Sequence, residues 1–293
     1  MKSINLLAFD LGAESGRAIL GHFKNGTLQL EEVHRFANGP VYQPDGLHWD
    51  ILRLWTEIQN GLKLAVQRGP LGGAGMDTWG VDFALLDAQD VLIGNPYHYR
   101  DSRTDTMMDE AFRRVPRPEI FASTGIQFMQ LNSLYQLMAA RRSPTFELAR
   151  TFLTIPDLFN FWMTGRKACE FTVATTTQCY NPLIGDWARP MLDRLDIPVH
   201  IFPEIVPPGT LLGDLSPAVA ESLGIQPIPI IAPACHDTGS AVAAVPAEGS
   251  DFAWISSGTW SIIGVNVPRA VMTPEALEYN LTNEGGAGGT FRL

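Results

Sequence analysis

Cysteine is scarce in this chain and follows no functional pattern. Only three of the 293 residues are cysteine, and no two of them form a C-x-x-C pair. An odd number of cysteines without such a pair excludes a disulfide framework and gives no indication of a zinc site. We therefore expect a protein of a reducing compartment, the cytoplasm, where thiols stay free.

Long apolar runs and an excess of positive charge are also missing. The run Ile4–Phe9 is cut by Asp10 and follows a single lysine, so we expect no signal peptide. No stretch reaches the roughly 18 apolar residues of a membrane span. Lysine and arginine number 21 against 31 acidic residues, which gives a net charge of −10. Nucleic acid and membranes are therefore not expected partners, and the sequence gives no prediction of oligomeric state.

The phosphate-binding consensus G-x-x-x-x-G-K-[ST] does not occur in the sequence. The glycine-rich run 285–290 lacks the lysine, and Phe291 stands where G-x-G-x-x-G requires its last glycine. This run therefore predicts a flexible loop, and a nucleotide site would have to use other loops.

The first 86 residues predict a mixed α/β pattern. Apolar residues make up 45% of the chain and charged residues 18%, which is normal for a protein with a sizeable core. Asn25-Gly26 predicts a tight hairpin turn, and Asp50 predicts the N-cap of a helix with apolar positions at a helical period. The predicted elements are strands at 4–10, 17–23 and 28–36, a helix at 51–65, and strands ending near Thr78 and spanning 81–86. This order is typical of the start of an actin-like (ribonuclease H-like) ATPase domain.

The remainder predicts the end of one domain and the start of another. Helical patterns dominate 104–165, and the Pro- and Gly-rich stretch 181–229 is expected to be irregular between short helices. A strand before His236 and a helix after it close a complete first domain, 1–246. Strands on either side of Gly258-Thr259 then weakly repeat the first hairpin. The 47 residues after position 246 fall below the roughly 50 of a stable domain, so we expect the second domain, 247–293, to be incomplete.

The dipeptide His236-Asp237 lies where an apolar run meets a stretch of small residues, which predicts a strand-to-helix junction. Ligands of open α/β folds bind beyond the carboxyl ends of the strands. A carboxylate there can accept the proton of a substrate hydroxyl during phosphoryl transfer. The alternative is that Asp237 caps the helix by accepting from the amide of Gly239 or Ser240, with His236 a hydrogen-bonded structural residue.

A second candidate is the turn between the first two strands, Asp10–Arg17. Its glycines allow backbone amides to approach phosphate oxygens, and Asp10 could hold a water of hydrated Mg²⁺. The alternative is an ordinary hairpin that ends near an aspartate. The similar context of Ser256–Ser261 favours two such loops facing each other across a nucleotide.

Two further segments have the composition of a sugar pocket. Asp77–Phe83 and Tyr99–Arg103 combine hydrogen-bonding side chains with aromatic rings, which suits the hydroxyls and apolar faces of sugars. The alternative is a packed hairpin followed by a surface ion pair.

Together these segments resemble the FGGY family of carbohydrate kinases. The resemblance extends almost from end to end and rests on Asp10–Arg17, Asp77–Asp87, Tyr99–Thr104, Gly125–Phe128, Ile155–Asp157, Thr175–Gln178, His236–Thr238, Ser256–Gly264 and Leu281–Gly286. It implies ATP- and Mg²⁺-dependent phosphorylation of a small-molecule ketose. The segments DTWGVDF and SSGTWS narrow the implied substrate to L-rhamnulose, phosphorylated on its O1 hydroxyl as a step of rhamnose breakdown.

The resemblance also implies roles for individual residues. Asp237 would be the catalytic base. The sugar would contact Gly80, His236, Asp237 and Thr238, and ATP would contact Ala13, Glu14, Ser15, Gly16, Arg17 and Thr259. The family continues beyond this point with the rest of a second domain. Two alternatives stay open: a kinase for another ketose such as fuculose, and a non-catalytic sugar-binding fragment.

Overall fold

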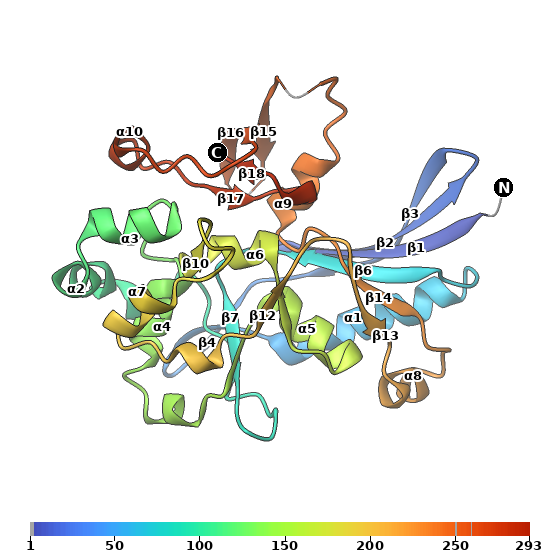
Figure 1. Ribbon diagram of the computed structural model, residues 1–293. Coiled ribbons are helices and arrows are strands. Elements are labelled where there is room, and N and C mark those ends of the chain that lie inside the picture. Colours follow the sequence, from blue (N-terminus) through green and yellow to red (C-terminus); the bar gives the residue numbers. More distant parts are fainter. Residues whose placement is uncertain (1–2, 250, 259) are drawn as a thin grey trace.

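The computed structural model describes residues 3–249, 251–258 and 260–293 (Figure 1). These residues form a mixed sheet of six strands in the order β13-β14-β6-β1-β2-β3. Strands β14, β6 and β1 run parallel, and the outer strands are antiparallel to their neighbours. The predicted mixed α/β class is confirmed. The strands are β1 (Ile4–Leu11), β2 (Ser15–Lys24), β3 (Thr27–Ala37), β6 (Gly73–Thr78), β13 (Thr210–Asp214) and β14 (Pro229–Ala232).

The predicted hairpin and first helix are both present. Asn25 and Gly26 adopt φ angles of 53° and 78° between β2 and β3, the left-handed pair that a two-residue hairpin turn requires. Helix α1 (Ile51–Val66) begins where the Asp50 carboxylate accepts from the Arg53 amide at 3.2 Å. Its apolar face is buried, so a local cap and a helical period together determine this element.

Helices α1 and α5 (Ile155–Thr164) cover one face of the sheet side by side (Figure 1). The rings of Trp55 on α1 and Phe159 on α5 stack with centroids 6.3 Å apart. The other helices are α2 (Met107–Arg114), α3 (Arg117–Thr124), α4 (Ser133–Ala140), α6 (Phe171–Thr176), α7 (Arg189–Arg194), α8 (Pro217–Leu223), α9 (Asp237–Ala243) and α10 (Pro274–Glu278).

Several short strands complete the described part of the chain. The last part of the chain forms the sheet β15-β16-β18-β17, and the rest pair in twos. These strands are β4 (Pro40–Gln43), β5 (Gly46–Trp49), β7 (Phe83–Leu86), β8 (Thr151–Thr154), β9 (Ala168–Glu170), β10 (Tyr180–Asn181), β11 (Asp186–Trp187), β12 (Glu204–Val206), β15 (Ala253–Ser257), β16 (Ser261–Val267), β17 (Glu284–Gly285) and β18 (Phe291–Arg292).

Some predicted boundaries are wrong for local reasons. The strand predicted from 81 begins only at β7, because Val81 has a φ of 66° and cannot extend a strand. The strand before His236 ends at Ala232, because Pro233 has no N–H to donate to a ladder. The run 285–290 is a hairpin between β17 and β18 rather than a flexible loop. The predicted turn residue Thr259 lies outside the described residues.

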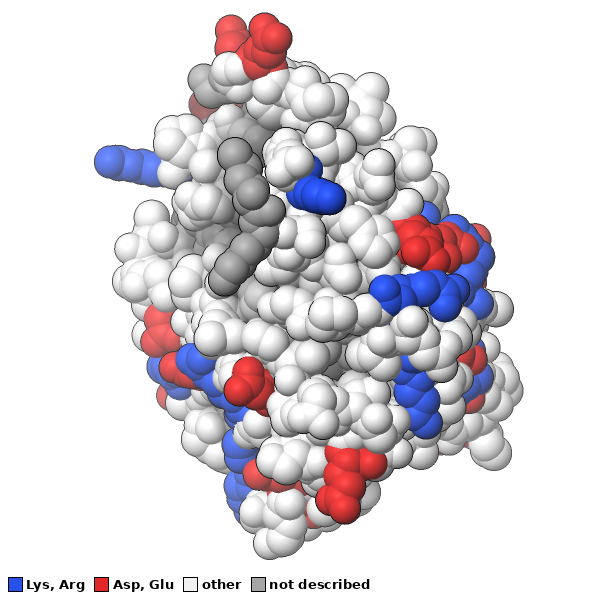
Figure 2. Space-filling view, turned by 90° about the vertical axis from the view of Figure 1, so that its right-hand side faces the viewer, with Lys and Arg blue, Asp and Glu red and all other residues white. Residues whose placement is uncertain are grey.

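Figure 2 shows one face of the molecule, on which basic and acidic side chains lie interspersed among uncharged ones. Among the described residues, no helix is long and apolar enough to cross a membrane.

The contact between β6 and the end of β14 leaves no room for a side chain at Gly75. A Cβ atom there would lie 2.8 Å from the backbone oxygen of Ile231, and backbone cannot rotate away. We expect Gly75→Ala to lower the free energy of unfolding by about 1–3 kcal/mol, measured by urea denaturation. Gly39, where a Cβ would meet nothing within 4 Å, supplies the control: Gly39→Ala should stay within about 0.5 kcal/mol of wild type. Equal stability of the two variants would contradict this packing argument.

Candidate active site

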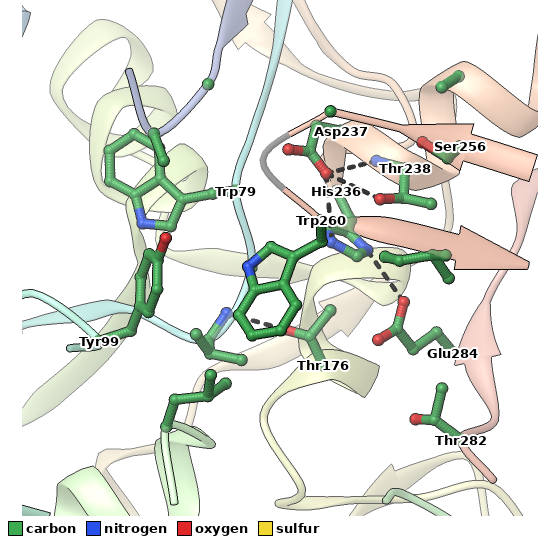
Figure 3. Close-up of a pocket in the computed structure, with 18 of the residues that line it drawn as sticks. Trp79, Tyr99, Thr176, His236, Asp237, Thr238, Ser256, Trp260, Thr282 and Glu284 are labelled. Carbon is green, nitrogen blue, oxygen red and sulfur yellow. Dashed lines mark hydrogen bonds and ion pairs between the residues drawn. The ribbon is translucent and has the colours of Figure 1, made fainter. Parts of the chain in front are cut away.

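A cavity of about 960 Å³ opens at the carboxyl ends of the parallel strands β1, β6 and β14 (Figure 3). Parallel pairing aligns these ends: Asp10 of β1 lies opposite Asp77 of β6, and Thr78 bridges to His236. The Thr78 amide also donates to the carbonyl of Cys235 at 2.9 Å. The polar residues at the carboxyl ends of these three strands therefore lie together at one edge of the sheet, where ligands of open α/β folds bind.

Most of the predicted site residues meet at this cavity. Those that line it are Asp10, Ala13, Glu14, Ser15, Arg17, Gly80, His236, Asp237 and Thr238. Among the described residues, Gly16 does not line it; a Cβ there would lie 2.3 Å from the Phe36 ring, so Gly16 packs inside the hairpin. Thr259 lies outside the described residues, between Gly258 and Trp260, which both line the cavity.

Asp237 stands at the first position of α9 and does not cap it. The N-cap residue is His236, and the Ser240 amide donates to the His236 carbonyl at 3.0 Å. Oδ1 of Asp237 instead accepts from the backbone amide of Thr238 and from its hydroxyl, the latter at 3.1 Å. The interpretation of Asp237 as the helix cap is therefore wrong, and its side chain is 36% exposed beside the cavity.

Buried bonds hold the loop that carries Asp237. Oε2 of Glu170 accepts from the amides of Thr172 and Val173, which caps α6, and also from the amide of Cys235 at 3.0 Å. The Thr172 hydroxyl accepts from the His236 amide at 3.1 Å. Burial raises the pKa of Glu170 to about 7, although these bonds oppose the shift. One buried carboxylate thus fixes α6 and the loop before α9 relative to each other.

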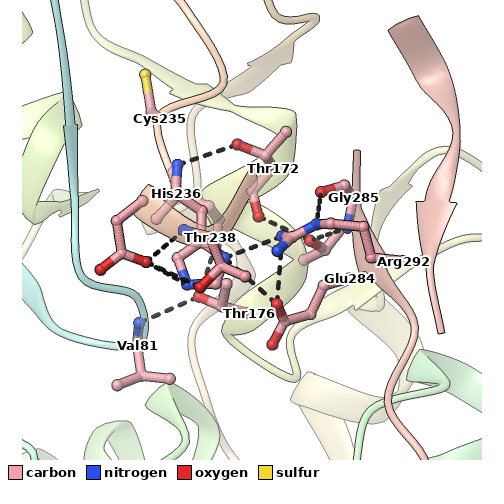
Figure 4. Close-up of polar contacts among 12 residues, drawn as sticks. Val81, Thr172, Thr176, Cys235, His236, Thr238, Glu284, Gly285 and Arg292 are labelled. Carbon is pink, nitrogen blue, oxygen red and sulfur yellow. Dashed lines mark hydrogen bonds and ion pairs between the residues drawn. The ribbon is translucent and has the colours of Figure 1, made fainter. Parts of the chain in front are cut away.

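His236 is buried at the centre of a polar chain (Figure 4). Its Nε2 lies 3.3 Å from Oδ1 of Asp237. Its Nδ1 lies 2.9 Å from Nη2 of Arg292 and 3.3 Å from Oε2 of Glu284. Glu284 and Arg292 were not predicted as site residues. The segment LTNEGG contains Glu284, whereas Arg292 lies outside every segment on which the resemblance rests.

Three carboxylates, those of Asp10, Asp77 and Asp237, line the cavity at the ends of the parallel strands. Burial, together with the charges of Asp10 and Asp237, raises the pKa of Asp77 well above its usual range. Arg17 pairs with Asp10, with Nη2 and Oδ2 2.7 Å apart. Within the described residues no three His, Cys, Asp or Glu side chains are arranged to hold a metal ion. Mg²⁺, however, needs only one or two carboxylates plus waters and phosphate. Asp10 and Asp77 fit that role, because a cation beside them would relieve their repulsion.

One part of the cavity wall is aromatic, and the buried carboxylate of Asp82 lies behind it. Trp79, Tyr99 and Trp260 line the cavity, and Figure 3 shows the Trp260 ring pointing in from the second hairpin. Oδ2 of Asp82 accepts from Nε1 of Trp49 at 2.6 Å and from Nε1 of Trp79 at 3.0 Å. It also accepts from the Tyr99 amide at 3.2 Å. Asp82 itself is 1% exposed, so it holds residues of the cavity wall in place and does not line the cavity itself.

Gly80 provides a stretch of wall without a side chain. A Cβ there would lie 3.0 Å from the side chain of Thr176, and the hydroxyl of Thr176 accepts from the Val81 amide at 3.1 Å. The backbone therefore faces the cavity directly, as a close-fitting ligand requires.

Comparison with known proteins identifies the family. Residues 5–244 match the FGGY family of carbohydrate kinases, N-terminal domain. The chain belongs to this family. It is 46% identical to the rhamnulokinase of Oceanobacillus iheyensis over 98% of this chain and 61% of that protein. It is 44% identical to the rhamnulokinase of Bacteroides thetaiotaomicron over 99% of this chain and 60% of that protein. The chain thus spans about 60% of the length of these relatives.

Solved structures agree with the fold. A ligand-bound xylulose kinase from Lactobacillus acidophilus superposes with a TM-score of 0.87 at 19% identity, over 99% of this chain and 59% of that chain. A carbohydrate kinase from Novosphingobium aromaticivorans superposes with a TM-score of 0.80 at 22% identity, over 100% of this chain and 62% of that chain. The predicted actin-like fold is confirmed, whereas the domain boundary at 246 stays a prediction.

The buried Asp82 should make stability depend on pH. Burial raises its pKa to about 6, although bonds from Gln136, Trp49 and Trp79 oppose the shift. An acid with a raised folded pKa stabilises the fold most below its unfolded pKa, near 4, and this contribution is lost as pH rises through about 6. Two pH units correspond to about 3 kcal/mol. The free energy of unfolding of wild type minus that of Asp82→Asn should therefore fall by about 3 kcal/mol between pH 4 and pH 7.

Urea denaturation at both pH values measures this difference, because groups common to both proteins cancel. Asp109→Asn, at an exposed position, is the control and should show the same difference from wild type at both pH values. A pH-independent difference for Asp82→Asn would show that Asp82 has no raised pKa in the folded protein.

Proposed function

We propose that this protein transfers the γ-phosphoryl group of ATP to the O1 hydroxyl of L-rhamnulose and forms L-rhamnulose 1-phosphate. The observation that carries the proposal is the carboxylate of Asp237, half-exposed to a large cavity at the carboxyl ends of three parallel strands. Relatives at 38–46% identity over nearly the whole chain bear the name rhamnulokinase. Fold, cavity and relatives thus support the same reaction.

Asp237 would act as the general base. Its Oδ1 is engaged by Thr238 and His236, while no described residue bonds Oδ2, which stays available to a hydroxyl in the cavity. As the sugar O1 forms its bond to phosphorus, the bond from phosphorus to the leaving ADP oxygen breaks, and the O1 proton passes to Oδ2. Phosphoryl transfer requires in-line positioning more than covalent help from the protein.

The two hairpin loops would hold the phosphates. The turn after β1 is closed by the Gly12 amide, which donates to the Ser15 carbonyl at 2.9 Å. Ser256 and Gly258 line the same cavity from the hairpin of β15 and β16. ATP, when bound with Mg²⁺, supplies the phosphoryl group, and Asp10 with Asp77 would face its metal-bound water.

The proposed setting is the cytoplasm, where ATP is available. All three cysteines are free and buried, as expected for a reducing compartment.

Replacing Asp237 should abolish phosphorylation but leave the binding of L-rhamnulose intact. We expect Asp237→Asn to lower the phosphorylation rate by about 10²–10⁴-fold, because only the proton acceptor is lost. The dissociation constant for L-rhamnulose, measured by calorimetry, should stay within about threefold of wild type. Asp193→Asn, exposed and outside the cavity, is the matched control and should leave both quantities unchanged. A rate within a few-fold of wild type for Asp237→Asn would refute the base assignment.

A ketose panel tests the substrate. With Mg·ATP, we expect L-rhamnulose to be phosphorylated with a kcat/KM at least about tenfold above those of L-fuculose and D-xylulose, since a polar pocket discriminates by placed hydrogen bonds. Equal turnover of the three ketoses would remove the specific assignment. Calorimetric binding of L-rhamnulose without any phosphorylation would instead support the non-catalytic sugar-binding alternative.

A further inference from the structure

Behind Asp237, side chains from the last two strands extend the polar chain through His236. We propose that Arg292 and Glu284 are positioning residues, which keep the ring proton of His236 on Nε2 and thereby orient the carboxylate of Asp237. The proposal rests on the proposed function, in which Asp237 is the base.

The contacts of Arg292 determine where the histidine proton lies. Its side chain is 2% exposed, and its Nε donates to the Gly285 carbonyl at 2.9 Å. Its Nη2 lies 2.9 Å from Nδ1 of His236. A guanidinium nitrogen only donates, so this contact is a hydrogen bond when Nδ1 accepts and carries no proton. In the tautomer that we propose, the ring proton lies on Nε2, 3.3 Å from Oδ1 of Asp237.

Glu284 supplies a counter-charge for the buried guanidinium of Arg292. A buried guanidinium without a counter-charge is strongly destabilising, and Oε2 of Glu284 lies 3.2 Å from Nη2 of Arg292. The same oxygen lies 3.3 Å from Nδ1 of His236. If Arg292 were absent, a proton on Nδ1 could bond Glu284 instead, and Nε2 would lose the proton that it offers to Asp237. Arg292 thus selects the tautomer with the proton on Nε2, whereas Glu284 alone would favour the one with the proton on Nδ1.

The consequence for Asp237 is a fixed orientation. Thr238 donates to Oδ1 through its amide and hydroxyl, and Nε2 of His236 lies 3.3 Å from the same oxygen as a third polar contact. Figure 3 shows Asp237 beside His236 and Thr238, and Figure 4 shows His236 between Thr238 on one side and Glu284 and Arg292 on the other. With Oδ1 held from three directions, Oδ2 is turned toward the cavity.

This orientation depends on a part of the chain distant in sequence. Glu284 and Arg292 lie on β17 and β18, in a different sheet from β14, which precedes His236. The Gly285 amide donates to the Thr175 hydroxyl at 2.7 Å, which docks β17 on α6. The base is therefore aligned only when this second sheet is docked on the first part of the molecule.

Nitrogen NMR of the chain labelled with ¹⁵N-histidine reports the tautomer without any need for turnover. The signal of His236 is identified by its absence in His236→Gln. We expect Nε2 to be protonated and Nδ1 unprotonated in wild type, and the proton to move to Nδ1 in Arg292→Met. Arg189→Met is the control: Arg189 donates to the Val199 carbonyl at 2.8 Å, outside the cavity, and its loss should leave the His236 signals unchanged.

Each result decides the proposal. A wild-type His236 with its proton on Nδ1, or on both nitrogens, overturns it, even if Arg292→Met fails to fold. A folded Arg292→Met that keeps the wild-type tautomer overturns it as well. The Glu284→Gln variant, in which Arg292 still faces Nδ1, should keep the wild-type tautomer, and a proton on Nδ1 there would contradict the selecting role of Arg292.

Kinetics separate this proposal from the proposed function. A misplaced histidine proton in a catalytic triad lowers kcat by up to about 10⁴-fold. We expect Arg292→Met to lower kcat at least about tenfold, with the KM for L-rhamnulose within about threefold of wild type. A wild type with the expected tautomer but no phosphorylation would refute the kinase and leave the proton arrangement standing. Turnover with the wrong tautomer would refute only the positioning role.

Discussion

Parallel pairing of β1, β6 and β14 is the constraint on which the site depends. Because these strands share a direction, the carboxylates of Asp10, Asp77 and Asp237 arrive at one edge of the sheet. Three like charges at one edge repel one another, and this repulsion contributes to the raised pKa of Asp77. The arrangement is unfavourable for an empty protein and suits one that binds a cation with phosphate. The fold therefore concentrates negative charge where the proposed chemistry would use it.

Two buried carboxylates, Glu170 and Asp82, hold different parts of the cavity wall in place. Glu170 fixes the loop before α9, and Asp82 holds the rings of Trp79 and Trp49. Both are desolvated, and burial raises the pKa of each. A buried carboxylate that accepts several N–H groups restricts the positions and orientations of the donor residues more than apolar packing does. Desolvation of these two carboxylates costs folding stability, and their hydrogen bonds fix the residues that surround the cavity.

The sequence predicted those features that local signals determine. Asn25-Gly26 and the cap at Asp50 act within a few residues, so the hairpin and α1 were found. Strand β8 was not found, because its four residues lie inside a helix-rich stretch and become a strand only by pairing with β7. In the site, Asp237 and its neighbours could be predicted because an apolar run followed by small residues indicates a strand-to-helix junction. The guanidinium of Arg292 reaches His236 across 56 positions, and no local pattern encodes such a contact.

A crystal structure of the chain with L-rhamnulose bound tests the central claim most directly. The quantity to measure is the distance from the sugar O1 to Oδ2 of Asp237. The account predicts that O1 lies within the roughly 2.6–3.2 Å of a general base from its substrate, with the sugar against the Gly80 backbone. A sugar bound outside this cavity, or bound in it with O1 directed away from Asp237, would contradict the assignment of Asp237 as the base.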